Sequence, residues 1–333
     1  MLAAVKTETI REIILENRDI PSLAHGEVLI NVDYCGICGS DLHAFNHSKG
    51  YEFVNKPIIL GHEISGKVVE CNDPESEYLI GKKVIVESMH YCGHCENCKN
   101  SRYSICESNK CIGLHFDGGM AEFVKTKSKY VREIPDGLPL SIAALSEPLS
   151  IAIHAVNRAG EINQGQTVLV QGPGIIGFFV ALVCVEKNAK VILSGLERDY
   201  ENRLSKCLDF GITPHIADKS SLSEKVDIVF ECSGSNVAVK NGFNNLKKGG
   251  RAVFVALYEQ DTNLFLTQLV RNEWPIITSY GCGPVDYVSA FNILQKYQNK
   301  LNNVVGFYPL SKVNQAFDNS LNQDVLKAVL SME

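Results

Sequence analysis

Four cysteines within fifteen residues constrain this 333-residue chain more than any other feature. They follow the spacing Cys92-x-x-Cys95-x-x-Cys98-x₇-Cys106. Such close and regular spacing is not typical of a disulfide framework, whereas short loops can bring four thiolates around one tetrahedral zinc ion. Because the protein would fill all four positions, we predict a closed, structural zinc site in a lobe at about residues 90–112. Three nearby candidates break this spacing: Cys111, His90 and His94.

The composition favours an ordinary globular protein in a reducing compartment. Apolar residues make up 45% and charged residues 21%, and the net charge is −6, so no basic face is offered to nucleic acid or anionic lipid. The N-terminal segment lacks a signal-peptide pattern, and no run approaches the roughly 18 apolar residues of a membrane span. We expect a cytoplasmic protein with no nucleic-acid or membrane partner. Its other cysteines, Cys38 apart, are expected to be reduced thiols: Cys35, Cys71, Cys111, Cys184, Cys207, Cys232 and Cys282.

The hydrophobic pattern divides the chain into a β-rich part and an alternating part. Short Val- and Ile-rich runs fill residues 1–130 and predict a partly open barrel. Residues 141–160 are apolar at helical spacing, and beyond them strand and helix patterns alternate. Alternation of this kind predicts an α/β fold with a doubly wound parallel sheet, whose first two helices we place at Ile175–Lys187 and Glu201–Phe210. After a helix at Val285–Gln298, the strand-like tail favours a return to the first domain. The predicted segments are 1–149, 150–284 and 285–333.

A glycine-rich turn marks the first strand-to-helix junction of the alternating part. In the pattern G-x-G-x-x-G, the first glycine permits a tight turn and the second lets the backbone approach a pyrophosphate. The third allows close helix packing, and the helix N-terminus faces the anion. We therefore predict a site for NAD(H) or NADP(H) on this turn: Gly172-Pro173-Gly174-Ile175-Ile176-Gly177.

The preferred nucleotide stays open. The second strand usually ends in an acid that binds the ribose 2′-OH of NAD, but here Ser194-Gly195 stand at that place. Glu197 and Asp199 follow shortly, with Arg198 between them. The missing acid and the nearby arginine favour NADP(H), whereas Glu197 or Asp199 could still reach the ribose from a longer loop. The three residues could also form a solvated turn with no cofactor contact.

A second group of metal-ligand residue types precedes the four cysteines. Cys38 opens the segment CGSDLH, and His62 and Glu63 follow Gly61. Cysteine, histidine and carboxylate suit zinc, and three protein ligands leave a fourth position for water or substrate. Taken alone, His62 could instead be a hydrogen-bonded core histidine and Cys38 a buried thiol.

Seven motifs occur along the chain in a familiar order: CGICGSDLH, GHEISG, CGHCENC…C, GGMAEFV, EPLSIAIHA, VLVQGPGIIG and VFECSGS. With them the whole chain resembles the zinc-containing medium-chain alcohol and polyol dehydrogenases, especially the sorbitol, threonine and sugar-alcohol branch. The resemblance implies a GroES-like catalytic domain interrupted by a Rossmann domain. It also implies hydride transfer between a secondary alcohol or its ketone and a nicotinamide cofactor, two zinc ions per chain, and a homo-oligomer, either a tetramer or a dimer.

The resemblance further implies individual roles. Cys38 and His62 are implied catalytic zinc ligands, and Glu63 can ligate or withdraw. Glu147 stands where the polyol branch has a second glutamate, which binds zinc directly or through water, and where alcohol dehydrogenases proper have cysteine. Asp41 matches the carboxylate that fixes the tautomer of the ligand histidine. The family's proton relay is implied for Ser40 and His43.

Several alternatives remain at this level. Ser40 could be a turn hydroxyl and His43 a solvent-facing side chain. The substrate could be a polyol, sugar, cyclitol, phosphorylated sugar or amino alcohol, and the segment Ala44–Lys56 does not reveal which. A zinc-free reductase-type relative or a non-catalytic nucleotide-binding protein would be expected to lack Cys38, His62 or Glu147. A zinc-ribbon nucleic-acid module would need basic residues around the four cysteines.

Overall fold

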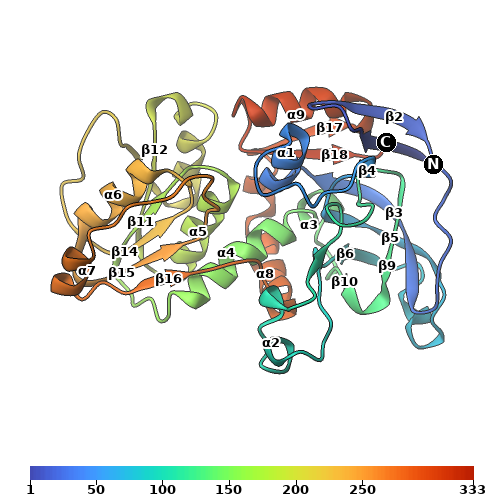
Figure 1. Cartoon of the computed structure of the whole chain (residues 1–333), viewed down its shortest axis with the longest axis horizontal. Coiled ribbons are helices and arrows are strands. Elements are labelled where there is room, and N and C mark those ends of the chain that lie inside the picture. The colour runs from blue at the N-terminus through green and yellow to red at the C-terminus, as the bar shows by residue number, and fades with distance from the viewer. The chain divides into compact units, whose positions relative to one another are not determined.

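The computed structural model describes residues 1–333, which form two compact units. The first unit combines Met1–Glu147 with Gly283–Glu333, and the second comprises Pro148–Cys282 (Figure 1). The first is rich in antiparallel strands and the second contains a six-stranded parallel sheet. The predicted α/β fold class is therefore confirmed. None of the helices is both long enough and apolar enough to cross a lipid bilayer.

A seven-stranded sheet organises the first unit. Its strands run in the order β10-β6-β5-β3-β18-β17, and β9 also pairs with β3. Alternate residues of β3, Val28, Ile30 and Val32, are buried, as expected when one face of a pleated strand packs on the core. Two small sheets, β2-β1-β4 and β7-β8, complete the strands. The strands are β1 (Leu2–Lys6), β2 (Ile13–Asn17), β3 (Glu27–Gly36), β4 (Ile58–Ile59), β5 (Glu63–Cys71), β6 (Lys83–Val86), β7 (Met89–His90), β8 (Lys110–Cys111), β9 (Phe123–Lys127), β10 (Val131–Glu133), β17 (Val305–Pro309) and β18 (Lys327–Ser331).

Five α-helices belong wholly to the first unit. They are α1 (Gly39–Asn46), α2 (Glu96–Lys99), α3 (Leu140–Ala143), α8 (Pro284–Leu301) and α9 (Val313–Leu321), and α4 (Ser146–Arg158) begins here. The register of β3 brings distant segments together, because Gly36 pairs with Glu63 of β5 on one side and with Val329 of β18 on the other. The end of β3, the start of β5 and the last strand of the chain thus meet next to the N-terminus of α1.

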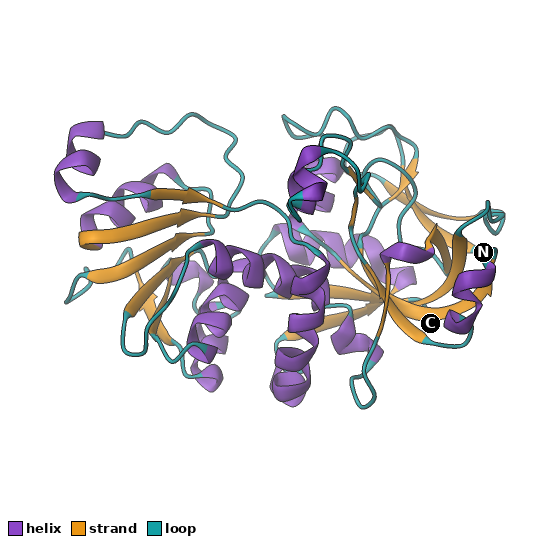
Figure 2. Ribbon diagram, turned by 90° about the horizontal axis from the view of Figure 1, so that it is seen from below, coloured by secondary structure: helices purple, strands orange, loops and turns teal.

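The second unit is a doubly wound sheet with the strand order β13-β12-β11-β14-β15-β16, all parallel. Right-handed crossovers from the two central strands lead in opposite directions, which places α5 and α6 on opposite faces (Figure 2). The carboxyl ends of β11 and β14 therefore form the switch point at which such sheets bind ligands. The elements are β11 (Thr167–Gln171), α5 (Ile175–Glu186), β12 (Lys190–Gly195), β13 (Thr213–Ile216), β14 (Val226–Glu231), α6 (Asn236–Asn245), β15 (Leu246–Phe254), α7 (Leu266–Asn272) and β16 (Ile276–Thr278).

One predicted helix has a different form. The α-helix expected over Glu201–Phe210 is a 3₁₀-helix over Leu204–Phe210. Its buried residues Leu204, Cys207 and Phe210 are spaced by three, which suits the three-residue turn of a 3₁₀-helix. Gly211 then ends it in the left-handed conformation, with φ of 74°.

Candidate active site

The four cysteines of the lobe converge. Their sulfur atoms all lie within 4.8 Å of one another, and the Cys92–Cys98 and Cys95–Cys106 sulfur pairs are each 3.9 Å apart. Zinc with Zn–S bonds of about 2.3 Å places tetrahedral sulfurs about 3.8 Å apart, so the group fits a zinc ion. Backbone N–H groups favour the thiolates: those of Glu107 and Cys98 lower the pKa of Cys95 to about 6.

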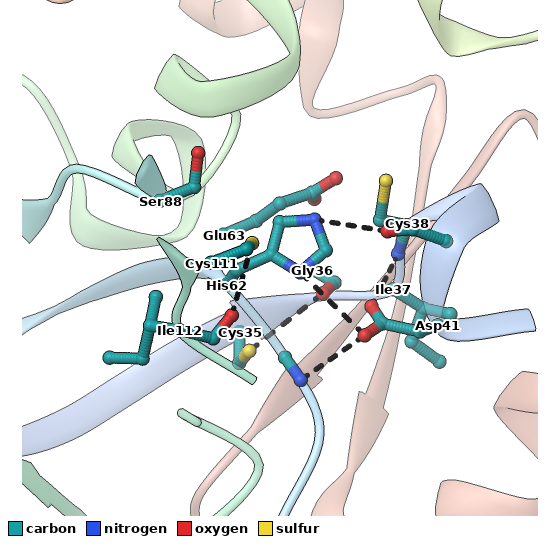
Figure 3. Close-up of polar contacts among 12 residues, drawn as sticks. Cys35, Gly36, Ile37, Cys38, Asp41, His62, Glu63, Ser88, Cys111 and Ile112 are labelled. Atoms are coloured by element: carbon teal, nitrogen blue, oxygen red, sulfur yellow. Dashed lines mark hydrogen bonds and ion pairs between the residues drawn. The ribbon is translucent and has the colours of Figure 1, made fainter. Parts of the chain in front are cut away.

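A second donor group gathers where the strands of the first unit meet. Cys38 precedes α1 as its N-cap residue, His62 follows Gly61 in a left-handed turn, and Glu63 opens β5. One donor atom from each of Cys38, His62 and Glu63 lies within 4.8 Å of the other two (Figure 3). Sulfur, imidazole nitrogen and carboxylate oxygen together are a donor set for zinc, so this group also fits the metal.

Asp41 organises this group from one side. Its fully buried carboxylate accepts the backbone N–H of Cys38 at 2.9 Å and that of Gly61 at 3.2 Å. The oxygen that binds Gly61 also faces His62 Nδ1 at 3.7 Å. The other ring nitrogen, Nε2, lies 3.4 Å from Ser40 Oγ, on the side of Cys38 (Figure 3). Asp41 thus ties both ligand-bearing turns together, and the ring nitrogen that faces away from it, Nε2, lies on the side of the donor group.

Glu63 is held by a residue that the sequence did not single out. The Lys327 ammonium of β18 contacts both Glu63 carboxylate oxygens and donates to Ile37 O at 2.7 Å. Both side chains are almost fully buried. Gly36 makes room for the pair, because a Cβ atom there would collide with Glu63 Oε2. Burial alone would lower the pKa of Lys327, but the Glu63 carboxylate raises it.

Glu147 lies outside the tight donor group and has a different partner. It stands in the first turn of α4, where its Oε1 accepts the hydroxyl of Ser88 at 2.8 Å. Ser88 in turn contacts Tyr287 of α8. Glu147 is buried, and this burial raises its pKa.

Two further residues of the region have well-defined surroundings. The His43 ring stacks on Tyr51 with centroids 5.0 Å apart, so it is not simply a solvent-facing side chain. Cys111 is not with the four cysteines but lies beside His62, opposite Cys38 (Figure 3). Burial raises the pKa of the Cys111 thiol to about 12, so it is neutral near pH 7.

Two of the three loop glycines of the second unit are required sterically, and the third borders open space. Gly172 has φ of 98°, and a Cβ atom there would lie 2.8 Å from Ser233 N. Gly177 packs against the Gly172 carbonyl, which leaves no room for a side chain. Gly174 is the N-cap of α5 and faces open space. Ile175 and Ile176 begin the helix. The loop therefore presents bare backbone and a helix N-terminus, as a pyrophosphate site needs.

The end of β12 explains the missing ribose acid. A Cβ atom at Gly195 would lie 2.6 Å from Pro173 Cγ, so the loop proline occupies the space of a side chain. Asp199 is buried and accepts the Leu196 N–H at 2.9 Å. Glu197 is exposed and pairs with Lys219 at 2.6 Å, and Arg198 is exposed. Both acids near the strand end are thus engaged with protein groups.

Sequence reasoning missed three residues of the metal region: Lys327, Ser88 and Tyr287. Lys327 stands 264 positions from Glu63, and Tyr287 stands 199 positions from Ser88. Only the charge of Lys327 at the start of β18, directly before three apolar residues, could have marked it as a buried partner. A single serine and tyrosine carry no such signal.

Comparisons with known proteins agree with this architecture. Residues 24–136 match the alcohol dehydrogenase GroES-like domain, and residues 176–296 match the zinc-binding dehydrogenase family. A sorbitol dehydrogenase from Halalkalibacterium halodurans is 31% identical, over 99% of this chain and 99% of the relative. A D-arabitol-phosphate dehydrogenase from Enterococcus avium is 30% identical, over 93% and 91%. The crystal structure of a zinc-binding dehydrogenase from Sinorhizobium meliloti, bound to NADP, is 25% identical with a TM-score of 0.90, covering 99% of both chains.

Proposed function

The chain belongs to the zinc-binding alcohol dehydrogenase family, and from that membership we propose that it oxidises a secondary alcohol of a polyol or sugar alcohol, with a nicotinamide nucleotide as hydride acceptor. One observation carries the proposal. Donor atoms of Cys38, His62 and Glu63 gather within 4.8 Å of one another beside the buried carboxylate of Asp41. A structural role alone would not need a mixed sulfur, nitrogen and oxygen donor group in addition to the four-cysteine lobe.

Cys38 and His62 would hold a catalytic zinc ion, with Glu63 or Glu147 as the acid of the site. Zinc bound there supplies Lewis-acid chemistry, which lowers the pKa of an alcohol hydroxyl. Asp41 faces His62 Nδ1 at 3.7 Å, which would leave Nε2 as the ligand atom. Cys92, Cys95, Cys98 and Cys106 would hold a second zinc ion that stabilises the lobe and takes no part in the reaction.

Ser40 is the first proton acceptor in this proposal. Its hydroxyl lies 3.4 Å from His62 Nε2, next to the ligand atoms. A hydroxyl can accept a proton from the substrate while donating its own, which suits a relay. His43 lies one helical turn further on the same helix and would pass the proton toward solvent.

The second unit would bind the nucleotide, and the end of β12 favours NADP(H). Pro173 leaves no room for an acid at Gly195, Asp199 caps its own turn, and Glu197 is paired with Lys219. No carboxylate is therefore set aside for a ribose 2′-OH, whereas Arg198 is exposed beside this place and can meet a 2′-phosphate. Of two nucleotide-bound structures with this fold, one holds NADP and the other NADH, so the preference rests on the end of β12 alone.

The substrate class follows from two relatives. One is a sorbitol dehydrogenase and the other a D-arabitol-phosphate dehydrogenase, so we propose a polyol or its phosphate ester. None of the twelve cysteines is part of a disulfide, in keeping with the proposal of a reducing compartment such as the cytoplasm. Assembly into a dimer or tetramer remains a prediction.

A substrate screen tests the proposal. The native protein is incubated with NADP⁺ or NAD⁺ and a panel of polyols, polyol phosphates and cyclitols, and the absorbance of the reduced nicotinamide is followed. We expect turnover with at least one polyol and a lower KM for NADP⁺. Cys38→Ser should abolish turnover and leave NADPH binding unchanged. The matched control is Cys71→Ser, because Cys71 is also a partly buried free thiol but lies outside both donor groups.

The outcomes separate the alternatives. Full turnover by Cys38→Ser would contradict the zinc mechanism and favour a zinc-free reductase-type enzyme. NADPH binding without turnover of any alcohol would favour a non-catalytic nucleotide-binding protein.

A further inference from the structure

A buried chain of hydroxyl groups connects α8 with Glu147. Ser88 Oγ lies 2.8 Å from Glu147 Oε1 and 3.2 Å from the Tyr287 hydroxyl. The Ser88 backbone N–H also points to that hydroxyl, at 3.0 Å. Ser88, Tyr287 and Glu147 are 1%, 2% and 5% exposed, so water does not compete for these bonds. Three segments far apart in the sequence thus converge on one carboxylate.

The donors and acceptors fix the direction of the chain. An ionised carboxylate only accepts, so the Ser88 hydroxyl must donate to Glu147. Because the single Ser88 hydroxyl proton is donated to Glu147, the contact between the two hydroxyls needs Tyr287 as its donor, while the Tyr287 oxygen accepts the Ser88 N–H. Each bond then polarises the next, which strengthens the hold on Glu147 Oε1 in a region of low dielectric.

The Ser88 hydroxyl is not needed for the local backbone. The turn between β6 and β7 already has its polar groups satisfied, because Ser88 N donates to Tyr287 and Ser88 O accepts the Ile112 N–H at 3.1 Å. What remains for the hydroxyl is the contact with Glu147. A side chain kept only for the turn would not need that oxygen.

The two acids, Glu63 and Glu147, have partners that differ in charge. The Lys327 ammonium contacts both oxygens of Glu63 and neutralises its charge. Glu147 receives only a neutral hydroxyl as its hydrogen-bond donor, although the charges of His62 and Lys327 also act on it. Burial of a carboxylate that has only a neutral hydroxyl as its direct partner is costly, which points to a cation as part of the working site.

We propose that Ser88 and Tyr287 are positioning residues, which fix one oxygen of Glu147 so that this carboxylate is presented, still charged, to the metal site formed by Cys38 and His62. The assignment rests on the proposed function, because it needs a cation at that site. Ser88 contacts Glu147 directly, and Tyr287 contacts Ser88. Their effect on metal binding therefore passes through Glu147.

Metal affinity in a double-mutant cycle tests this. Starting from the holoprotein, the site at Cys38 and His62 is emptied while the lobe keeps its metal. Zinc is then titrated back in competition with a chromophoric chelator. Ser88→Ala should weaken zinc binding at the Cys38 site about tenfold, whereas Ser88→Thr, which keeps the hydroxyl, should bind like the native protein. In a Glu147→Ala background, Ser88→Ala should cause no further loss. The zinc affinity of Tyr287→Phe should lie between that of Ser88→Ala and that of the native protein.

A spectroscopic readout accompanies the titration. With Co²⁺ at the second site, the visible bands of Ser88→Ala should shift relative to the native protein, and those of Ser88→Thr should not. Native-like affinity and spectra for both Ser88→Ala and Tyr287→Phe would overturn the proposal. So would an equal loss of affinity in the native and Glu147→Ala backgrounds, because Ser88 would then act independently of Glu147.

Failure of the proposed function gives a different result. In that case the native protein would bind no metal at Cys38, whatever residue stands at position 88. That result would overturn both the proposed function and the positioning of Glu147 for a metal. If the native protein and Ser88→Ala bind zinc equally well, only the positioning role is overturned.

Discussion

Lys327 shows how one side chain in the last strand controls a site assembled from the first part of the chain. Its ammonium and the Glu63 carboxylate are both buried, and Ile37 O takes a further hydrogen bond. A buried ion pair need not stabilise a protein relative to an apolar pair, but removal of one partner leaves the other charge buried and unpaired.

Lys327→Met should therefore destabilise the first unit by about 3–5 kcal/mol. Urea unfolding of the metal-free protein measures this loss. The matched control is Lys82→Met, which removes a lysine from the exposed ion pair with Glu133. Its effect should be small, because surface ion pairs contribute little. Equal losses in the two variants would show that the Glu63–Lys327 pair has no special importance.

Gly195 gives a second prediction at this scale. Gly195→Asp introduces the acid typical of NAD sites, but its Cβ atom meets Pro173 Cγ at 2.6 Å. We expect a loss of about 1–3 kcal/mol from overpacking and no gain in NADH affinity. Gly195→Ala should show the same loss, because it adds the Cβ atom without the charge.

The double variant Gly195→Asp with Pro173→Ala should recover stability and bind NADH more tightly than the native protein. Thermal unfolding and fluorescence titration with NADH and NADPH measure both effects. A Gly195→Asp variant with native stability and tight NADH binding would contradict the role of Pro173.

Individual residue types were predictable where the chemistry is local. Cys38, His62 and the four lobe cysteines stand in short motifs, and the structure brings each set together. Lys327 and Tyr287 reach the site only through strand register and helix packing, which no local pattern encodes. The absence of an acid at Gly195 was visible in the sequence, but its cause, the ring of Pro173, was not.

At the scale of elements, the lobe is attached through β7 and its neighbours. His90 of β7 stacks on Tyr130 with centroids 4.0 Å apart and lies 3.2 Å from Thr126 Oγ1. Burial lowers the pKa of His90 to about 4, and the Lys129 and Lys127 charges act in the same direction. The neutral ring is therefore part of the folded state.

This gives the protein a defined pH dependence. The unfolded chain binds a proton at His90 below about pH 6.5, whereas the folded protein does so only below about pH 4. The contribution to stability is therefore complete above pH 6.5 and is lost as the pH falls toward 4, by at most about 3 kcal/mol.

His90→Phe keeps the stacking and removes this titration. Its urea midpoint should fall less steeply than that of the native protein between about pH 6.5 and 4. Protonation of the lobe thiolates affects both proteins, so the difference between them isolates His90. Parallel curves for the two proteins would contradict the assignment.

The hydrophobic pattern predicted some helices and strands better than others. The helix predicted at Ile175–Lys187 is α5, one residue shorter, because its apolar run is continuous and starts at a glycine turn. The predicted helix at Glu201–Phe210 was wrong in type, because its buried residues repeat every three positions. Short strands such as β13, with four partly exposed residues, have no pattern that separates them from loops.

At the scale of the whole molecule, the sequence predicted the parallel sheet in more detail than the antiparallel one. Alternating strands and helices restrict a doubly wound sheet to few orders, and the observed order has its reversal beside the glycine loop. The first unit is assembled from strands at both ends of the chain, since β18 pairs with β3. Such remote antiparallel pairs are set by packing and not by local spacing.

The account as a whole requires two metal sites of different kinds in one chain. The lobe site has four thiolates and should hold its metal tightly, whereas the site at Cys38 and His62 has mixed sulfur, nitrogen and oxygen donors. Loss of either set should remove one metal and leave the other.

Zinc per chain, measured by elemental analysis of the native protein and of Cys38→Ser, tests this most directly. We predict about two zinc ions per native chain and about one in Cys38→Ser, with the remaining ion in the lobe. One zinc ion in both proteins would contradict the account, because the donor group of Cys38, His62 and Glu63 would then not be a metal site.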